Sequence, residues 1–83
     1  MKTRTILNVT IKVHNKREDR LLNLIQQYID DCIDCKNDGL NHTSAWYLEE
    51  INGMFTALYF LKCIKEPVTF SYDDLLNLYI SFN

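Results

Sequence analysis

The chain has 83 residues, a net charge of −2 and a hydrophobic fraction of 47%, which together indicate one folded domain over residues 1–83. Charged residues make up 24% of the chain, so the composition is not that of a disordered segment. No apolar run reaches the roughly 18–20 residues that a membrane span needs. A strand-like alternation, not a signal-peptide core, follows the first four residues. We therefore expect no membrane contact and a cytoplasmic location.

The charges are unevenly distributed along the chain. Residues 1–20 carry six Lys or Arg and two acids, which gives a net charge of +4. Residues 21–83 carry three Lys and nine acids, which gives a net charge of −6. A basic segment of this kind suits a phosphate or an acidic protein partner, although Lys and Arg also simply solvate a strand edge and a helix start. The candidate partner-binding residues of this segment are Arg4, Lys12, Lys16, Arg17 and Arg20.

Residues 4–13 alternate between apolar and polar side chains. Val9, Ile11 and Val13 fall on one side, and Thr10 and Lys12 fall on the other. A period of two with β-branched residues predicts one half-buried strand over residues 4–13. Such a strand needs a partner for its backbone groups.

A first helix is predicted over residues 16–36. Asn15 and Glu18 have the spacing of a capping box, and the apolar residues that follow recur three and four apart. Gly39 can adopt a positive φ and is typical of a helix end.

A second helix is predicted over residues 44–65, with Thr43 or Ser44 as its cap and Pro67 as the reason for its end. The helix is apolar on more than one side, so we expect it to be the centre of the fold, with Leu58 fully buried. Ile25 and Ile51 are expected to be buried with it. A second apolar face is formed by Trp46, Gly53, Ala57, Phe60 and Ile64.

The segment 68–82 allows two interpretations, which could follow one another. Val68, Phe70 and Tyr72 alternate as in a short strand that would pair with 4–13. Ser71 and Asp74 have the spacing that caps a last helix. The predicted fold is therefore mainly α (α+β), with an N-terminal strand, a long antiparallel helical hairpin and a short C-terminal strand, helix or both.

The three cysteines give little support for chemistry. Cys32 and Cys35 form a CxxC motif, but they fall at the negative end of a helix among aspartates, which raises a thiol pKa. A zinc site of Cys32, Cys35 and His42 lacks a fourth ligand, because Cys63 lies at the far end of the next helix. We expect buried free thiols, no metal, no cofactor and no enzymatic activity.

Aromatic residues crowd the last twelve positions, where a chain often frays. Tyr72, Tyr79 and Phe82 either dock on the core of the domain or contact a partner. We include them among the candidate partner-binding residues.

A strand followed by two helices resembles the ribbon-helix-helix DNA-binding proteins. The resemblance covers residues 4–64 and implies that Asn8, Thr10 and Lys12 read DNA and that two copies pair their strands. It departs from that family in the length of both helices and in the acidic net charge. In composition the chain also resembles small accessory proteins of bacteriophages, including inhibitors of host defence.

These observations favour a small non-enzymatic protein-interaction module, with a nucleic-acid-binding regulator as the alternative. A protein partner is expected, and a twofold homodimer is expected through the strand 4–13 or through the side of Gly53 and Ala57. We expect little DNA binding near physiological salt.

Overall fold

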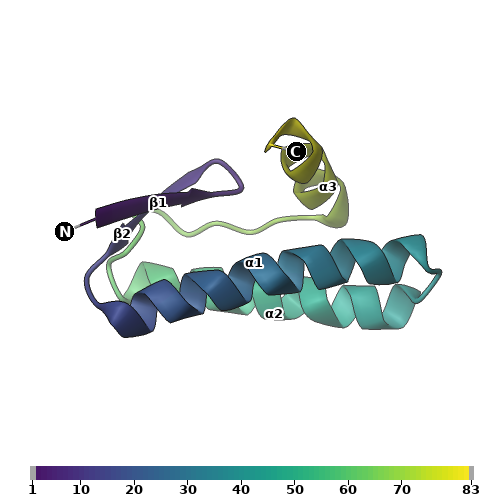
Figure 1. The fold of residues 1–83 in the computed structure, drawn as a ribbon, viewed down its shortest axis with the longest axis horizontal. Helices are drawn as coiled ribbons and strands as arrows, with labels where there is room; N and C mark the ends of the chain where they lie inside the picture. Colours follow the sequence, from purple (N-terminus) through teal and green to yellow (C-terminus); the bar gives the residue numbers. More distant parts are fainter. Residues whose placement is uncertain (1, 83) are drawn as a thin grey trace.

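A computed structural model describes the backbone of residues 2–82 and the side chains of residues 2–79. The elements in chain order are β1 (Lys2–Ile6), β2 (Val9–Val13), α1 (Lys16–Asn37), α2 (Asn41–Phe60) and α3 (Tyr72–Phe82). The two strands form one antiparallel sheet, and α1 and α2 form a helical hairpin (Figure 1). This arrangement confirms the predicted mainly α fold around a helical hairpin.

The N-terminal segment forms two strands, so the prediction of one strand over 4–13 is wrong. Ile6 pairs with Val9, which leaves only Leu7 and Asn8 for the turn. Both turn residues have positive φ, 50° and 67°, as in the tight hairpin turns that match the twist of the strands. Leucine seldom adopts this conformation, so the only sequence signal of the turn is Asn8, a residue type that tolerates positive φ. Burial of the Leu7 side chain offsets the strain.

The inward side of the β-hairpin joins the core of the domain. Ile6, Ile11 and Val13 are buried, and Thr10 and Lys12 are exposed, so the predicted alternation of β2 is correct. The partner of β2 is β1 and not a strand near residue 68.

The start of α1 is fixed by two side chains. Asn15 caps the helix, and its Oδ1 accepts a hydrogen bond from the Glu18 backbone N–H at 3.0 Å. The Glu18 carboxylate accepts in turn from the backbone N–H of His14, at 2.7 Å. The capping residues were therefore predicted correctly, but the return bond reaches one residue further back than in a capping box.

The end of α1 is fixed by Gly39, as predicted. Gly39 has a φ of 80°, its N–H donates to Lys36 O, and the N–H of Leu40 donates to Cys35 O. This pair of bonds is the Schellman motif. It shortens the interhelical connection, so that α2 already begins at Asn41.

The predicted cap of α2 is wrong because Ser44 lies inside the helix. Its hydroxyl donates to the backbone oxygen of Cys32 at 2.9 Å, and the Cys32 thiol donates to the backbone oxygen of Ser44 at 3.3 Å. Both residues are buried, so this small polar contact ties α1 to α2 near their connection.

The predicted end of α2 near Pro67 is also wrong, because the helix ends at Phe60 in a second Schellman motif. Lys62 has a φ of 62° and donates its N–H to Tyr59 O, and the N–H of Cys63 donates to Leu58 O. The Cys63 oxygen then accepts from the N–H of Lys12, at 2.8 Å. The chain therefore turns back towards β2 well before the proline.

No strand forms over residues 68–72, because the side chain of Asn52 satisfies the backbone there. The Asn52 amide donates to Phe70 O at 2.9 Å and accepts from Phe70 N–H at 2.8 Å. The ring of Phe70 packs edge-on against Phe55, with the centroids 5.1 Å apart. A side-chain amide thus takes the place of a neighbouring strand.

The helix interpretation of the C-terminal segment is correct, and its cap lies where the sequence indicated. The Ser71 hydroxyl accepts from the N–H of Asp74, and the Asp74 carboxylate accepts from the N–H of Ser71. Leu75, one residue further on, is fully buried and anchors α3 to the core.

The core lies between the helical hairpin and the elements that cover one of its sides. Ile25, Ile51 and Leu58 are all 0% exposed, as predicted. Figure 1 shows the β-hairpin, the chain after α2 and α3 on the same side of α1 and α2. The opposite side of the helical hairpin carries no further element of the described chain.

We expect Asn52→Ala to lower the free energy of unfolding by about 1–3 kcal/mol, because it leaves the N–H and the carbonyl of buried Phe70 without partners. Asn52→Asp keeps an acceptor for the N–H but cannot donate to the carbonyl while it is ionised. Its deficit relative to the unmodified chain should therefore shrink as the pH falls and the new carboxyl becomes protonated. Urea unfolding of both variants, near neutral pH and in acid, measures these deficits, with exposed Asn23→Ala as the control. A deficit of Asn52→Asp that is the same at the two pH values would contradict the paired hydrogen bonds.

We expect Lys62→Gly to raise the free energy of unfolding by about 0.5–1 kcal/mol, because glycine adopts a positive φ without the cost that a Cβ carries. Lys65→Gly is the matched control, since Lys65 is also exposed but has no positive φ. Thermal unfolding of the two variants makes the comparison. A loss of stability in both would show that the chain reversal does not depend on this conformation.

Candidate functional site: the open face of the helical hairpin

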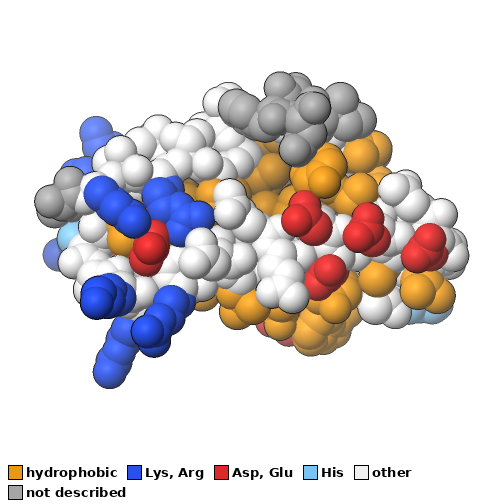
Figure 2. Space-filling model, in the orientation of Figure 1, with side chains coloured by type: hydrophobic (Ala, Val, Ile, Leu, Met, Phe, Trp, Pro, Cys, Tyr) orange, Lys and Arg blue, Asp and Glu red, His pale blue; other side chains and the backbone are white. Residues whose placement is uncertain are grey.

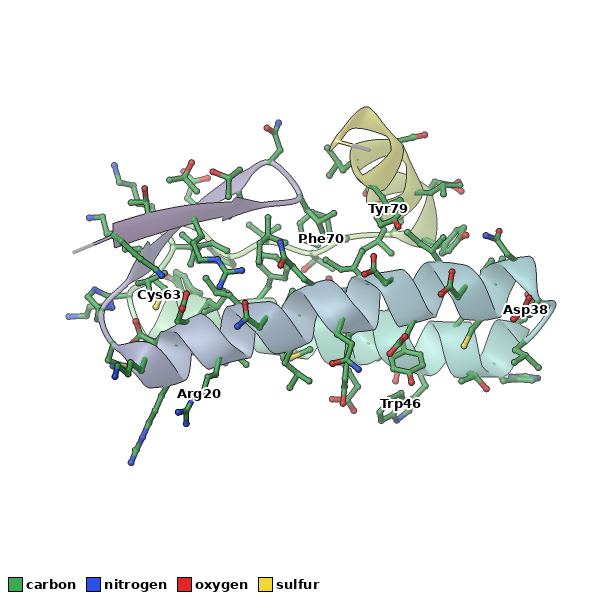
Figure 3. All side chains as sticks on the ribbon, viewed as in Figure 1. Arg20, Asp38, Trp46, Cys63, Phe70 and Tyr79 are labelled. Carbon is green, nitrogen blue, oxygen red and sulfur yellow. The ribbon has the colours of Figure 1, made fainter. Side chains whose placement is uncertain are left out.

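The uncovered side of the helical hairpin carries exposed apolar side chains. Figure 3 shows Arg20 and Trp46 pointing away from the β-hairpin and α3. Side chains three or four residues apart share a helix face, which places Leu24 and Tyr28 in a row with Arg20. We call this surface the open face, and it consists of Arg17, Arg20, Leu24, Tyr28, Asp31, Trp46, Gly53, Ala57 and Leu61.

Several large apolar side chains of the open face are exposed to solvent. Leu24 is 40% exposed, Trp46 48% and Leu61 49%, and Phe60 at the border of the face is 76% exposed. Single exposed apolar residues are common, but a group of them on one side of a small domain indicates an interaction surface.

Trp46 is held in place by neighbouring rings. Its ring lies 6.0 Å from that of Tyr28 and 5.1 Å from that of Tyr47, measured between centroids. Tyr28 and Tyr47 are themselves 5.1 Å apart in an edge-to-face contact. A fixed aromatic side chain loses little conformational entropy on binding, which suits a contact residue.

Because Gly53 and Ala57 are small, no side chain projects far from the centre of α2 on the open face. A Cβ placed on Gly53 would meet no atom within 4 Å, and Ala57 is exposed. The sequence analysis offered this side as a contact with a second copy, and within the single chain no side chain among residues 2–79 fills the space beside Gly53. Trp46, Gly53, Ala57 and Phe60 do form one exposed apolar face, whereas Ile64 lies beyond the helix and is buried.

The open face carries opposite charges at its two ends. Arg17 and Arg20 are at the start of α1, and Asp31 is near its end. None of these three takes part in an ion pair within the described residues. Figure 2 shows the same separation over the visible surface, with Lys and Arg gathered at one end and acids along the other half of α1.

Arg4 has an internal role, although we predicted it as a partner contact. Its guanidinium lies 2.8 Å from the Asp19 carboxylate and also donates to Asp19 O and to the side chain of Gln26. Lys2 adds a second ion pair to Asp19, at 3.2 Å. Hydrogen bonds from Arg4 and then Lys2 hold the pKa of Asp19 below its usual value. These contacts fasten β1 to α1.

The other predicted basic residues do not share one surface. Lys12 points outward from β2 and lines a shallow pocket with Lys62 and Lys65. Lys16 is exposed at the start of α1, and only Arg17 and Arg20 belong to the open face. The prediction that these residues contact a partner stays untested.

The aromatic residues of α3 pack against the domain. Tyr72 is half-buried, with the Lys36 ammonium 5.3 Å from its ring centroid. Tyr79 is half-buried and lines a pocket beside Asp30, whose charge is the main cause that raises the Tyr79 pKa. The side chain of Phe82 lies outside the described residues.

Cys32, Cys35 and His42 do not form a ligand set. Cys32 is buried against Ser44, Cys35 is half-buried and His42 is exposed. Burial, and then the charge of Asp31, raises the pKa of Cys35, as expected at this end of the helix. A raised pKa lowers the fraction of the thiol present as thiolate, which is the reactive form.

Cys63 instead lies beside His14 and Glu18, which sequence reasoning did not anticipate. His14 Nδ1 is 2.8 Å from the Glu18 carboxylate and 3.8 Å from Cys63 Sγ. Burial and then Glu18 raise the pKa of Cys63 to about 11, so the thiol is no nucleophile by itself. The pKa of Glu18 is lowered, chiefly by the backbone hydrogen bond from His14.

Comparison of the chain with protein-family models, curated proteins and solved structures finds no match. None of the described helices combines the length and the apolar character that crossing a membrane requires.

We expect Arg4→Gln to reduce the loss of stability in acid. The folded-state pKa of Asp19 lies below its unfolded value of about 3.9, so its contribution is present above that value and is lost as the pH falls through the folded-state pKa. Without Arg4 the Asp19 pKa returns towards the unfolded value, and less stability remains to be lost. Urea unfolding near neutral pH and in acid measures this, with Lys16→Gln as the control. The same acid loss in both variants would contradict the role of the ion pair.

Proposed function

We propose that the chain is a non-enzymatic protein-interaction module and that its binding surface is the open face. The observation that carries this proposal is the one-sided cover of the helical hairpin, which leaves Leu24 and Trp46 exposed on the bare side. An exposed apolar surface in water gains free energy when a second apolar surface covers it. Two antiparallel helices are best covered by another helix or pair of helices.

The occupant that we propose for the open face is a second copy of the chain. Two helical hairpins stacked face to face form a four-helix arrangement, and a twofold axis between them makes the contact self-complementary. If that axis runs across the helices, each α1 lies antiparallel to the α1 of the other copy. The basic end of one open face then meets the acidic end of the other.

The spacing along the helices agrees with this arrangement. Placing Arg20 opposite Asp31 of the second copy brings Leu24 opposite Tyr28 of that copy, because both pairs have nearly the same sum of residue numbers. On α2 the same axis sets the large ring of Trp46 against the small Ala57. Large side chains therefore meet small or apolar ones, and Arg20 meets an acid.

The open face favours protein over nucleic acid as the partner. Arg4 is engaged with Asp19, and Lys12 lines a pocket with Lys62 and Lys65 that Arg17 and Arg20 do not line. A nucleic-acid binder needs its positive charge concentrated along one surface. The DNA-reading alternative also required a single free strand, whereas β1 pairs with one edge of β2 and the Cys63 carbonyl accepts from the Lys12 N–H at the other.

A cytoplasmic location and an accessory role of the phage type belong to this proposal. Three unpaired thiols, Cys32, Cys35 and Cys63, suit a reducing compartment. An inhibitor or accessory protein acts by occupying a surface of another protein, and the open face is the surface available for it. Such a target competes with the second copy for the same residues.

We expect sedimentation equilibrium at micromolar concentration to give twice the chain mass of 9.9 kDa. Arg20→Glu should weaken the dimer about tenfold, because it sets acid against acid at both ends of a twofold contact. Asp31→Lys should weaken it for the converse reason. A mixture of the two variants should restore association as a heterodimer, since each altered charge then meets an opposite one.

The control is Lys65→Glu, a charge reversal at an exposed position away from the open face, which should leave the mass unchanged. Trp46→Asp tests the apolar part of the contact and should give monomers. A monomer mass in the unmodified chain, or a mixture that fails to associate, would contradict the proposed dimer.

A further inference from the structure

Three potential metal ligands converge where the ends of different elements meet. His14 is in the turn after β2, Glu18 is in the first turn of α1, and Cys63 follows the end of α2. One ligand atom from each lies within 4.8 Å of the other two. This is the one such convergence of three ligand residues in the described part of the chain. Figure 3 shows Cys63 in the region between the β-hairpin and the start of α1.

The distances approach those of a tetrahedral zinc site. Zinc binds sulfur at about 2.3 Å and nitrogen or oxygen at about 2.0–2.2 Å, so neighbouring ligand atoms are roughly 3.2–3.7 Å apart. The 3.8 Å between Cys63 Sγ and His14 Nδ1 is already close to this spacing. The 2.8 Å between His14 Nδ1 and the Glu18 carboxylate needs to lengthen by roughly half an ångström.

The backbone holds these residues in position without a metal. Cys63 donates its N–H to Leu58 O, and its carbonyl accepts from the N–H of Lys12, so both sides of its peptide are fixed. The Glu18 carboxylate accepts from the backbone N–H of His14 at 2.7 Å. Hydrogen bonds of this kind orient metal ligands and lower the entropic cost of binding.

We propose that His14, Glu18 and Cys63 bind one zinc ion, with water in the fourth position. One imidazole nitrogen, one carboxylate oxygen and one sulfur form a set that suits zinc, whereas magnesium and calcium require oxygen ligands. His14 is partly exposed, with its side chain 34% accessible, so the fourth position faces solvent. This proposal replaces the sequence-based expectation of no metal, which considered Cys32, Cys35 and His42 and set Cys63 aside as too distant from them.

The binding step is balanced by one proton. The Cys63 thiol releases its proton to solvent and its sulfur bonds to the ion. The proton that lies between His14 Nδ1 and the Glu18 carboxylate moves to Nε2, which frees the lone pair of Nδ1 for the ion. The Glu18 carboxylate exchanges its contact with His14 Nδ1 for the ion and keeps its backbone hydrogen bond. The carboxylate and the thiolate together balance the two charges of the ion, so the loaded site is neutral.

The test is a titration of the purified, metal-free, reduced protein with zinc, and with cobalt as a spectroscopic probe. We expect one zinc per chain and, with cobalt, the thiolate charge-transfer absorption and the visible bands of a tetrahedral ion. Cys63→Ser should remove the charge-transfer absorption and weaken zinc binding at least a hundredfold. His14→Gln should weaken zinc binding at least tenfold.

Cys35→Ser is the matched control, because Cys35 is the half-buried thiol beside Asp31 and would be the source of a fortuitous site. It should leave stoichiometry and spectrum unchanged. If Cys63→Ser does not fold, His14→Gln decides, since its side chain is partly exposed and circular dichroism can verify its fold. Absence of zinc binding by the unmodified chain, or loss of binding with Cys35→Ser alone, would overturn the proposal.

Discussion

The reversal of the chain at Lys62 and Cys63 is the constraint on which the rest of the structure depends. The backbone of Lys62 takes a positive φ, and the N–H groups of Lys62 and Cys63 close the end of α2. The Cys63 carbonyl then binds the N–H of Lys12, so the returning chain is fixed along β2. The chain after this reversal, from Phe70 to α3, therefore lies on the side of the helical hairpin that the β-hairpin already covers. The opposite side remains open for the same reason.

The same reversal links the proposed dimer to the proposed zinc site. It brings Cys63 to His14 and Glu18 at one end of the helical hairpin, and it leaves Leu24 and Trp46 exposed along the other side. A zinc ion bound by His14, Glu18 and Cys63 would connect the end of α2 to the start of α1. It would thereby hold the basic end of the open face in the geometry that the proposed dimer requires.

The elements whose signals are local could be predicted from the sequence, and those fixed by distant contacts could not. Asn15 and Gly39 mark the ends of α1 through their own side-chain or backbone properties. The turn at Leu7 carries no such signal, because burial of leucine and not turn propensity stabilises it. The local pattern around Phe70 predicts a strand. The hydrogen bonds that take the place of strand pairing come from Asn52, 18 residues away, and so leave no local signal.

The candidate sites follow the same division. The spacing of Trp46, Gly53 and Ala57 on one side of α2 was readable from helical periodicity, but whether that side was covered depended on the path of the chain after Phe60. The contact of Cys63 with His14 joins residues 49 positions apart, so no local pattern indicates it.

Trp46 offers the most direct measurement of the central claim, because it is the one tryptophan of the chain and lies on the open face. The quenching of its fluorescence by acrylamide should be measured from nanomolar to high micromolar protein concentration. Our account predicts that quenching becomes weaker and the emission shifts to the blue as the second copy covers the ring. Quenching that stays equally strong over the whole concentration range would show that the open face remains in water, and would contradict the account.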